Sequence, residues 1–134
     1  MKLITILGTT ATGKTRLAAR LAYQIGGEII SADSRQVFRG MNIGTGKDYD
    51  DYLVEGETIP YHLIDIANAG EEFSVHDFQK AFIKAFHEIE GKGKAVILCG
   101  GTGLYLEAAI KKYNFPNAPL NNELRRELES FTDI

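Results

Sequence analysis

The sequence predicts an α/β protein in which a parallel β-sheet is covered by helices on both faces. Short apolar runs alternate with segments of helical periodicity, in the order strand, helix, strand and then again strand, helix, strand. The runs are uniformly apolar, which is typical of parallel strands buried on both sides. A chain of 134 residues with 44% hydrophobic and 25% charged residues has the size and composition of one globular domain.

The first half of the chain predicts a strand, a helix and a second strand. Residues 2–7 are apolar and β-rich and run into a glycine, so they are expected to form a strand rather than a signal peptide. Helical periodicity begins at Lys14 and stops at the glycine pair 26–27. Residues 28–31 resume as a strand, and the Gly-, Asp- and Tyr-rich stretch 40–60 is expected to be a loop. The apolar stripe of the helix consists of Leu17, Leu21 and Ile25.

The second half repeats the pattern. Residues 61–66 are a candidate for a third strand, and a capping box over 74–77 starts a long helix that ends at Gly91. Residues 94–99 form a strongly apolar strand, and residues 104–110 are expected to be helical. The stripe of the long helix consists of Val75, Phe78, Phe82, Phe86 and Ile89.

Charge and composition exclude several classes of function. The formal net charge is −3, so the chain is a poor candidate for an autonomous nucleic-acid-binding protein. No apolar run approaches the roughly 20 residues that a bilayer requires, so we expect no membrane span. The single cysteine, Cys99, fits a reducing cytoplasm and is expected to be a core residue. The acid-free stretch 34–47, with Arg35, Arg39 and Lys47, leaves a local anion-facing patch open.

The strongest functional signal is a complete P-loop, G-x-x-x-x-G-K-[ST], between the first strand and the first helix. Its glycines let successive backbone N–H groups point at one anion, at the positive end of a helix dipole. Lys14 adds a charge for the terminal phosphate, and the Thr15 hydroxyl can ligate Mg²⁺. The motif makes the predicted sheet P-loop NTPase-like. Its expected diphosphate-binding residues are Gly8, Thr9, Thr10, Ala11, Thr12, Gly13, Lys14 and Thr15.

Two further side chains follow predicted strands and have both functional and structural interpretations. Asp33 is placed to take a proton from a nucleophile or to anchor a Mg²⁺-bound water, or else it caps the next turn. Thr102, in a Gly-Gly-Thr-Gly turn, is placed to contact a phosphate oxygen, or else it is the N-cap of the following helix. Because ligands bind beyond the carboxyl ends of parallel strands, the P-loop, residues 31–36 and residues 100–103 are expected to meet. Asp65 has too little support to join this site.

Together these segments resemble the tRNA dimethylallyltransferase (tRNA isopentenyltransferase) family. The resemblance runs from Leu3 to about Arg126 and rests on five segments in order: GTTATGKT, SADSRQVFRGMNIGTGK, YHLIDI, FSVHDFQKA and CGGTGLYLEA. The second segment is far more restrictive than a P-loop. Thr9 stands where the family usually has proline, Gly46-Lys47-Asp48 replaces the more usual Ala-Lys-Pro, and family members are much longer.

The resemblance implies transfer of a dimethylallyl group from dimethylallyl diphosphate to the N6 amine of the adenosine beside the tRNA anticodon, with release of pyrophosphate. Asp33 would be the general base at that amine, and Thr102 would contact the flipped-out base and the diphosphate bridge. Mg²⁺, held by Thr15, is the implied cofactor, the anticodon stem-loop is the implied partner, and the implied location is cytoplasmic. The tRNA contacts that the resemblance implies are Asp33, Ser34, Arg35, Gln36, Thr102 and Arg125.

The resemblance also divides the chain. Residues 1–113 correspond to the P-loop catalytic core, and residues 114–134, with a predicted polar helix over 121–130, correspond to the start of the helical tRNA-binding insertion. Family members are monomers, whereas a core without the rest of the family's length is expected to be prone to self-association through exposed apolar surface.

Three alternatives stay open at this point. A small P-loop kinase would carry a strand-end carboxylate like Asp33, but no arginine-rich lid is evident in the sequence. An adenylate isopentenyltransferase shares the P-loop and the aspartate but uses a free nucleotide as acceptor. A non-catalytic, diphosphate-binding fragment is the alternative that the short length favours.

Overall fold

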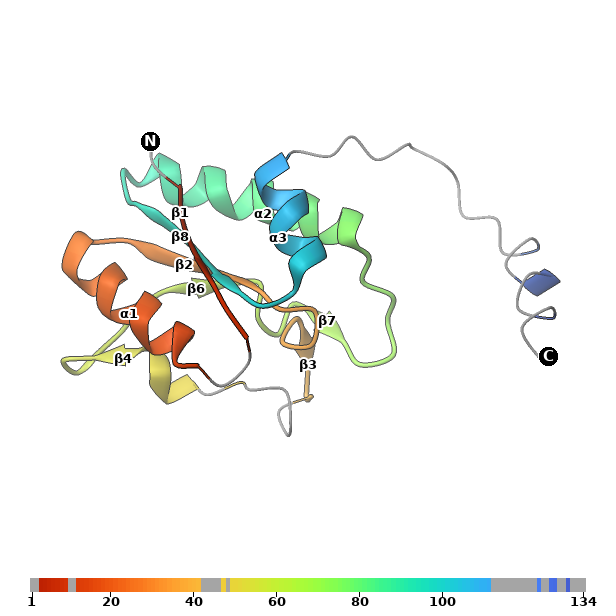
Figure 1. Ribbon diagram of the computed structural model, residues 1–134, viewed down its shortest axis with the longest axis horizontal. Helices are drawn as coiled ribbons and strands as arrows, with labels where there is room; N and C mark the ends of the chain where they lie inside the picture. Colours follow the sequence, from red (N-terminus) through yellow and green to blue (C-terminus); the bar gives the residue numbers. More distant parts are fainter. Residues whose placement is uncertain are drawn as a thin grey trace.

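The computed structural model describes residues 3–9, 12–41, 47, 49–111, 123, 126, 127 and 130. Strands and helices are interspersed along the chain, with several short strands in succession between residues 53 and 68 (Figure 1). The elements are β1 (Leu3–Leu7), α1 (Lys14–Ile25), β2 (Glu28–Ala32), β3 (Phe38–Arg39), the 3-10 helix η1 (Tyr49–Tyr52), β4 (Leu53–Val54), β5 (Glu57–Thr58), β6 (Tyr61–His62), β7 (Ala67–Asn68), α2 (Val75–Gly91), β8 (Val96–Gly100) and α3 (Gly103–Lys111).

The central sheet has four strands in the order β1-β8-β2-β6, and every pair in it is parallel. In register, Ile4 lies opposite Ile97, and Ile30 lies opposite Leu98. All residues of β2 and β8 are buried, which explains why the sequence shows unbroken apolar runs there. Two small ladders flank the sheet: β3 pairs with β7 in parallel, and β4 pairs with β5 antiparallel. The predicted α/β class with a parallel sheet is confirmed.

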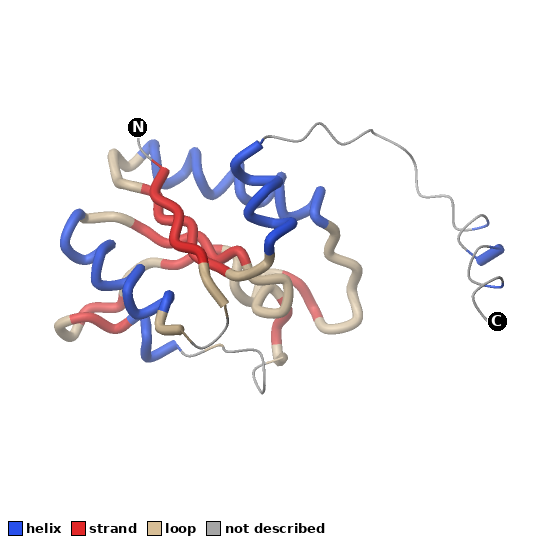
Figure 2. The backbone as a smooth tube through the Cα atoms, viewed as in Figure 1, coloured by secondary structure: helices blue, strands red, loops and turns tan. Residues whose placement is uncertain are grey.

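Helices cover both faces of this sheet. Figures 1 and 2 show α2 and α3 on one side and α1 on the other. The strand residues divide accordingly, because Ile30 and Leu98 pack in the cluster with α2 and α3 while Ile29 and Ile97 pack in the cluster with α1. Each of these four side chains is fully buried, and each burial contributes about 1.5–3 kcal/mol.

The capping box of α2 forms as predicted. The Ser74 hydroxyl accepts a hydrogen bond from the Asp77 backbone N–H at 3.1 Å, and the Ser74 N–H donates to the Asp77 carboxylate at 2.9 Å. The predicted stripe also faces the core: Phe78 and Ile89 are fully buried, and Phe78 stacks on Tyr105 of α3 with ring centroids 4.2 Å apart. This pair joins the two helices on that face.

Glu28 begins β2 as a fully buried carboxylate at the amino end of the sheet. It contacts His62 Nε2 at 2.7 Å, Lys92 Nζ at 3.1 Å and Lys94 Nζ at 3.2 Å. Burial by itself would raise the pKa of Glu28, but the hydrogen bonds from His62, Lys92 and Lys94 outweigh it and lower the pKa to about 2. The cluster ties β2 and β6 to the turn before β8.

Two predictions about local structure are wrong. The buried face of α1 is made of Ala18, Ala19 and Ala22, whereas Leu17 and Ile25 are 59% and 44% exposed. Alanine has a small side chain, so the helix packs on the sheet through its alanine face. The long apolar side chains at every fourth position indicate a helix, but they do not show which side of the helix is buried.

The third strand is shorter than predicted, and the loop is more ordered. Only Tyr61–His62 pairs with β2, because Leu63 and Asp65 adopt positive φ angles of 65° and 57° that no strand continues. Within the predicted loop 40–60, the structure contains η1 and the β4–β5 ladder. In the predicted polar helix 121–130, the four described residues (123, 126, 127 and 130) are helical, and the others lie outside the described residues. None of the helices in the described part of the chain is long and apolar enough to cross a membrane.

Candidate functional site

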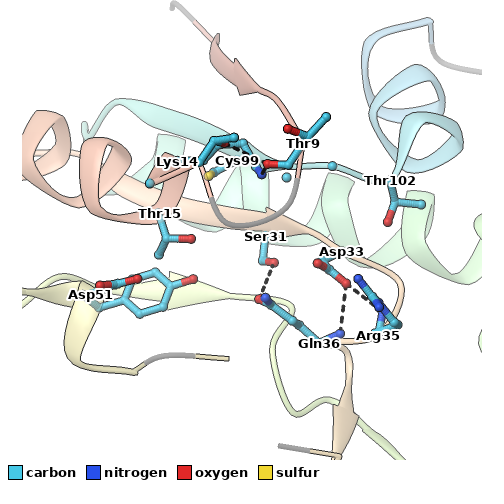
Figure 3. Close-up of a pocket in the computed structure, with 15 residues that line it drawn as sticks. Thr9, Lys14, Thr15, Ser31, Asp33, Arg35, Gln36, Asp51, Cys99 and Thr102 are labelled. Atoms are coloured by element: carbon cyan, nitrogen blue, oxygen red, sulfur yellow. Dashed lines mark hydrogen bonds between the residues drawn. The ribbon is translucent and has the colours of Figure 1, made fainter. Parts of the chain in front are cut away.

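The three predicted strand ends meet at one pocket of about 390 Å³ at the carboxyl edge of the sheet (Figure 3). This is the place where open parallel sheets bind ligands. Its lining comes from the P-loop and the start of α1, from the turn after β2, from η1 and from the turn after β8. The lining residues are Thr9, Thr12, Gly13, Lys14, Thr15, Ser31, Asp33, Arg35, Gln36, Asp51, Tyr52, Cys99, Gly100, Gly101 and Thr102.

The P-loop presents an uncapped helix N-terminus to this pocket. Gly13 is the N-cap of α1, with φ 82° and ψ 17°, a left-handed conformation that glycine adopts without strain. Among the residues that the structure describes, no side chain caps the helix, so its first N–H groups are left for another acceptor. The Thr9 carbonyl accepts hydrogen bonds from the Lys14 ammonium and, at 2.8 Å, from the Thr12 hydroxyl. These features provide the positive end of a helix dipole and a cation in one place.

Other P-loop residues are placed as follows. Thr15 lines the pocket together with Cys99. Burial raises the pKa of the Cys99 thiol to about 11, against the opposing effects of Lys14 and Thr15, so the thiol is neutral. The prediction that Cys99 is a core residue is confirmed, and the side chain also borders the pocket. Gly8 lies just before the pocket lining, and the diphosphate-binding predictions for Thr10 and Ala11 lie outside the described residues.

Asp33 has the capping geometry that its structural interpretation requires. Its Oδ1 accepts backbone hydrogen bonds from Arg35 at 2.9 Å and from Gln36 at 3.3 Å, which Figure 3 draws as dashed lines. Within the part of the chain that the structure describes, Oδ2 has no hydrogen bond. One carboxylate oxygen therefore holds the turn while the other is available to a ligand in the pocket.

Thr102 joins two strand ends instead of capping α3 with its side chain. Its hydroxyl oxygen accepts a hydrogen bond from the Ser34 backbone N–H at 3.0 Å and lies 3.4 Å from the Ser34 hydroxyl. Its own N–H donates to the Ala32 carbonyl at 3.2 Å. This close approach requires glycine at position 100, because a Cβ there would lie 2.3 Å from the Ala32 carbonyl oxygen. The contact fixes Asp33 and Thr102 on neighbouring sides of the pocket.

The basic stretch 34–47 is only partly an anion-facing patch. Arg35 is exposed and lines the pocket, whereas Arg39 donates to Asn68 at 3.0 Å. The Lys47 side chain is completely buried and pairs with Asp65 at 2.6 Å, so it does not face solvent. Of the three cations in the stretch, Arg35 is the one that the structure places at the site.

Sequence reasoning missed two residues of the site, Asp51 and Tyr52 of η1. Asp51 accepts from Arg16 at 3.3 Å, and Tyr52 is 4% exposed. Burial, helped by the nearby Cys99, Tyr61, Asp51 and Asp33, raises the pKa of Tyr52 well above its ordinary value of 10.0. No motif marks these residues, and a Gly- and Asp-rich segment without apolar periodicity gives no signal that it folds back on the P-loop.

Arg125, the remaining predicted tRNA contact, lies outside the described residues. Among the residues that are described, no three His, Cys, Asp or Glu side chains are grouped so as to hold a metal ion by themselves.

Comparisons with known proteins give consistent results. A family model described as IPP transferase matches residues 36–133. The tRNA dimethylallyltransferase 1 of Azobacteroides pseudotrichonymphae is 57% identical over 128 residues, which are 96% of this chain and 42% of that protein. The full-length tRNA isopentenylpyrophosphate transferase of Bacillus halodurans has a TM-score of 0.80 at 43% identity, over 98% of this chain and 43% of that one.

A third relative is a eukaryotic dimethylallyltransferase whose crystal structures show it acting on tRNA. Its TM-score is 0.73 at 32% identity, over 99% of this chain and 33% of that one. The chain thus spans less than half the length of each of these relatives.

Proposed function

The chain belongs to the IPP transferase family, and we propose that it forms the donor site and the catalytic base of a tRNA dimethylallyltransferase. The reaction moves a dimethylallyl group from dimethylallyl diphosphate to the N6 amine of an adenosine beside the anticodon. The observation that carries this proposal is the meeting of the P-loop, Asp33 and Thr102 at one pocket. A tRNA acceptor fits a cytoplasmic location for this activity.

The P-loop binds the diphosphate of the donor. The uncapped N-terminus of α1 and the Lys14 ammonium supply hydrogen bonds and positive charge where negative charge develops as the C–O bond breaks. Because this stabilisation grows as pyrophosphate departs, it lowers the barrier and not only the dissociation constant of the donor.

Mg²⁺ fits the side chains at this pocket. The lining offers oxygen ligands from Thr15, Asp33 and Asp51, and Mg²⁺ in proteins takes one or two such ligands together with phosphate oxygens and water. We assign Thr15 as its protein ligand. When bound, Mg²⁺ neutralises charge on the diphosphate.

Asp33 and Thr102 act on the acceptor. The free carboxylate oxygen of Asp33 takes the proton that the amine loses when its nitrogen bonds to the first carbon of the dimethylallyl group. Thr102, held by Ser34, contacts the extruded base and the bridging oxygen of the donor. Arg35, which is exposed, would bind the tRNA backbone. The further tRNA contacts in this proposal are Ser34, Gln36 and Arg125.

The short span of the chain supports a second candidate, a diphosphate-binding domain without transferase activity of its own. A labelled-donor assay separates the two. The 134-residue chain is incubated with Mg²⁺, labelled dimethylallyl diphosphate and either an anticodon stem-loop RNA or AMP, and pyrophosphate binding is measured in parallel.

Label transferred to the stem-loop and not to AMP is the expected result. Pyrophosphate binding without transfer would contradict transferase activity of this chain and support the second candidate. Transfer to AMP instead of RNA would overturn the assignment of tRNA as acceptor.

A further inference from the structure

Tyr52 is held rigidly at the edge of the pocket. Its ring lies 4.4 Å from the Tyr61 ring, measured between centroids, and packs in the core cluster between α1 and the sheet. Its backbone carbonyl accepts a hydrogen bond from Ile59 at 2.8 Å, which fixes the end of η1. The side chain therefore cannot turn away without opening the core, and the direction of its hydroxyl is set by the fold.

The hydroxyl of this buried side chain has no hydrogen-bond partner among the described residues, although the residue lines the pocket. Cys99, Tyr61, Asp51 and Asp33 each raise the pKa of this phenol electrostatically, but none of them accepts a hydrogen bond from it. With its pKa raised by burial and by these groups, the phenol stays protonated at neutral pH. It is a neutral hydrogen-bond donor on a part of the pocket wall that carries two carboxylates.

A neutral hydrogen-bond donor at this position suits an anionic ligand. The Lys14 ammonium and the α1 N-terminus attract a diphosphate from the P-loop side, whereas Asp33 and Asp51 offer it no hydrogen-bond donor. Among the described residues, the Tyr52 hydroxyl is not one of the fully buried polar atoms without a partner, so it is open to the pocket that its residue lines. There it offers a hydrogen bond to the diphosphate without adding charge. An amine acceptor, by contrast, needs a group that accepts protons, which Asp33 supplies.

We propose that Tyr52 is a further substrate-binding residue, whose hydroxyl donates a hydrogen bond to an oxygen of the diphosphate in the P-loop. This inference rests on the proposed function, because it takes the P-loop ligand to be a diphosphate. It assigns to η1, which carries no recognised motif, a direct part in holding the donor.

The test is a calorimetric titration of the 134-residue chain with inorganic pyrophosphate and Mg²⁺. Tyr52→Phe keeps the ring and its packing and removes only the hydroxyl. Tyr61→Phe is the matched control, because Tyr61 packs on the same ring but does not line the pocket. We expect the dissociation constant to rise about tenfold in Tyr52→Phe, as for loss of one hydrogen bond to a charged group, and to stay within about twofold in Tyr61→Phe.

Thermal unfolding gives a second readout that a purely structural role would not produce. Removing an unpartnered hydroxyl should leave the midpoint of the free protein unchanged, while the upward shift caused by pyrophosphate should shrink. Unchanged affinity in Tyr52→Phe would overturn this inference alone. Failure of the wild-type chain to bind pyrophosphate would overturn the proposed function and this inference together.

Discussion

Replacing Asp65 should destabilise the protein far more than replacing its partner Lys47. The Lys47 side chain is completely buried, and its ammonium donates to Asp65 at 2.6 Å and to the Phe38 carbonyl. Asp65 is 32% exposed and also accepts from the Tyr49 hydroxyl at 2.5 Å. The pair joins three segments, and the Asp65 N–H additionally donates to the Gln36 carbonyl at 3.1 Å.

The two replacements differ in the charged group that each leaves without its partner. Asp65→Asn leaves a buried ammonium without its counter-charge, and such losses cost about 3 kcal/mol or more. Lys47→Met leaves a carboxylate that keeps the Tyr49 hydrogen bond and reaches water, so we expect a cost of about 1 kcal/mol. For a domain of this size, the larger loss lowers the unfolding midpoint by roughly 10 °C.

Urea denaturation of both single variants and of the double variant measures these costs. The double variant should be more stable than Asp65→Asn alone, because it removes the buried charge together with its partner. Equal destabilisation by the two single replacements would refute the argument. A double variant that loses the sum of the two single losses in free energy of unfolding would refute it as well.

Three further predictions concern stability. Because the pKa of Glu28 is lowered to about 2, its ionised carboxylate contributes fully to the free energy of unfolding above its ordinary pKa of 4.5, and this contribution is lost as pH falls toward 2. The urea midpoint of the wild type should therefore fall more steeply over that range than the midpoint of Glu28→Gln. Gly100→Ala should cost at least about 2 kcal/mol in chemical denaturation, because its Cβ would lie 2.3 Å from the Ala32 carbonyl oxygen. Gly103→Ala meets nothing within 4 Å and should be neutral or slightly stabilising, and the opposite ranking would refute the packing argument. Ser74→Ala should cost about 1 kcal/mol in the same assay by removing the capping box of α2, and an unchanged midpoint would contradict that role.

The sequence predicted most of the fold because its strongest signals are local. The strands β2 and β8 are buried on both faces, so their apolar runs are unbroken, and the capping box of α2 is four adjacent residues. The buried side of α1 was misassigned because periodicity does not distinguish a face of Leu17 and Ile25 from one of alanines. Packing against the sheet decides that choice, and packing is not local.

The pocket likewise combines residues with local sequence signals and residues that only non-local contacts bring there. Its P-loop, Asp33 and Thr102 each follow a strand, so the rule for parallel sheets was enough to bring them together. Tyr52 reaches the pocket through a 3-10 helix in a segment without periodicity. Lys47 was grouped with surface cations because its burial depends on Asp65, 18 positions further along the chain. Contacts of this kind become visible only in three dimensions.

The most direct test of the account is dimethylallyl transfer by Asp33→Asn at saturating donor. Asparagine keeps an Oδ1 for the backbone N–H groups of Arg35 and Gln36 but cannot take a proton from the amine. We predict at least a hundredfold loss of transfer to the stem-loop RNA, with the dissociation constant of dimethylallyl diphosphate unchanged within about twofold. Transfer at the wild-type rate, or loss of donor binding in the same proportion as loss of transfer, would contradict the assignment of Asp33 as the base.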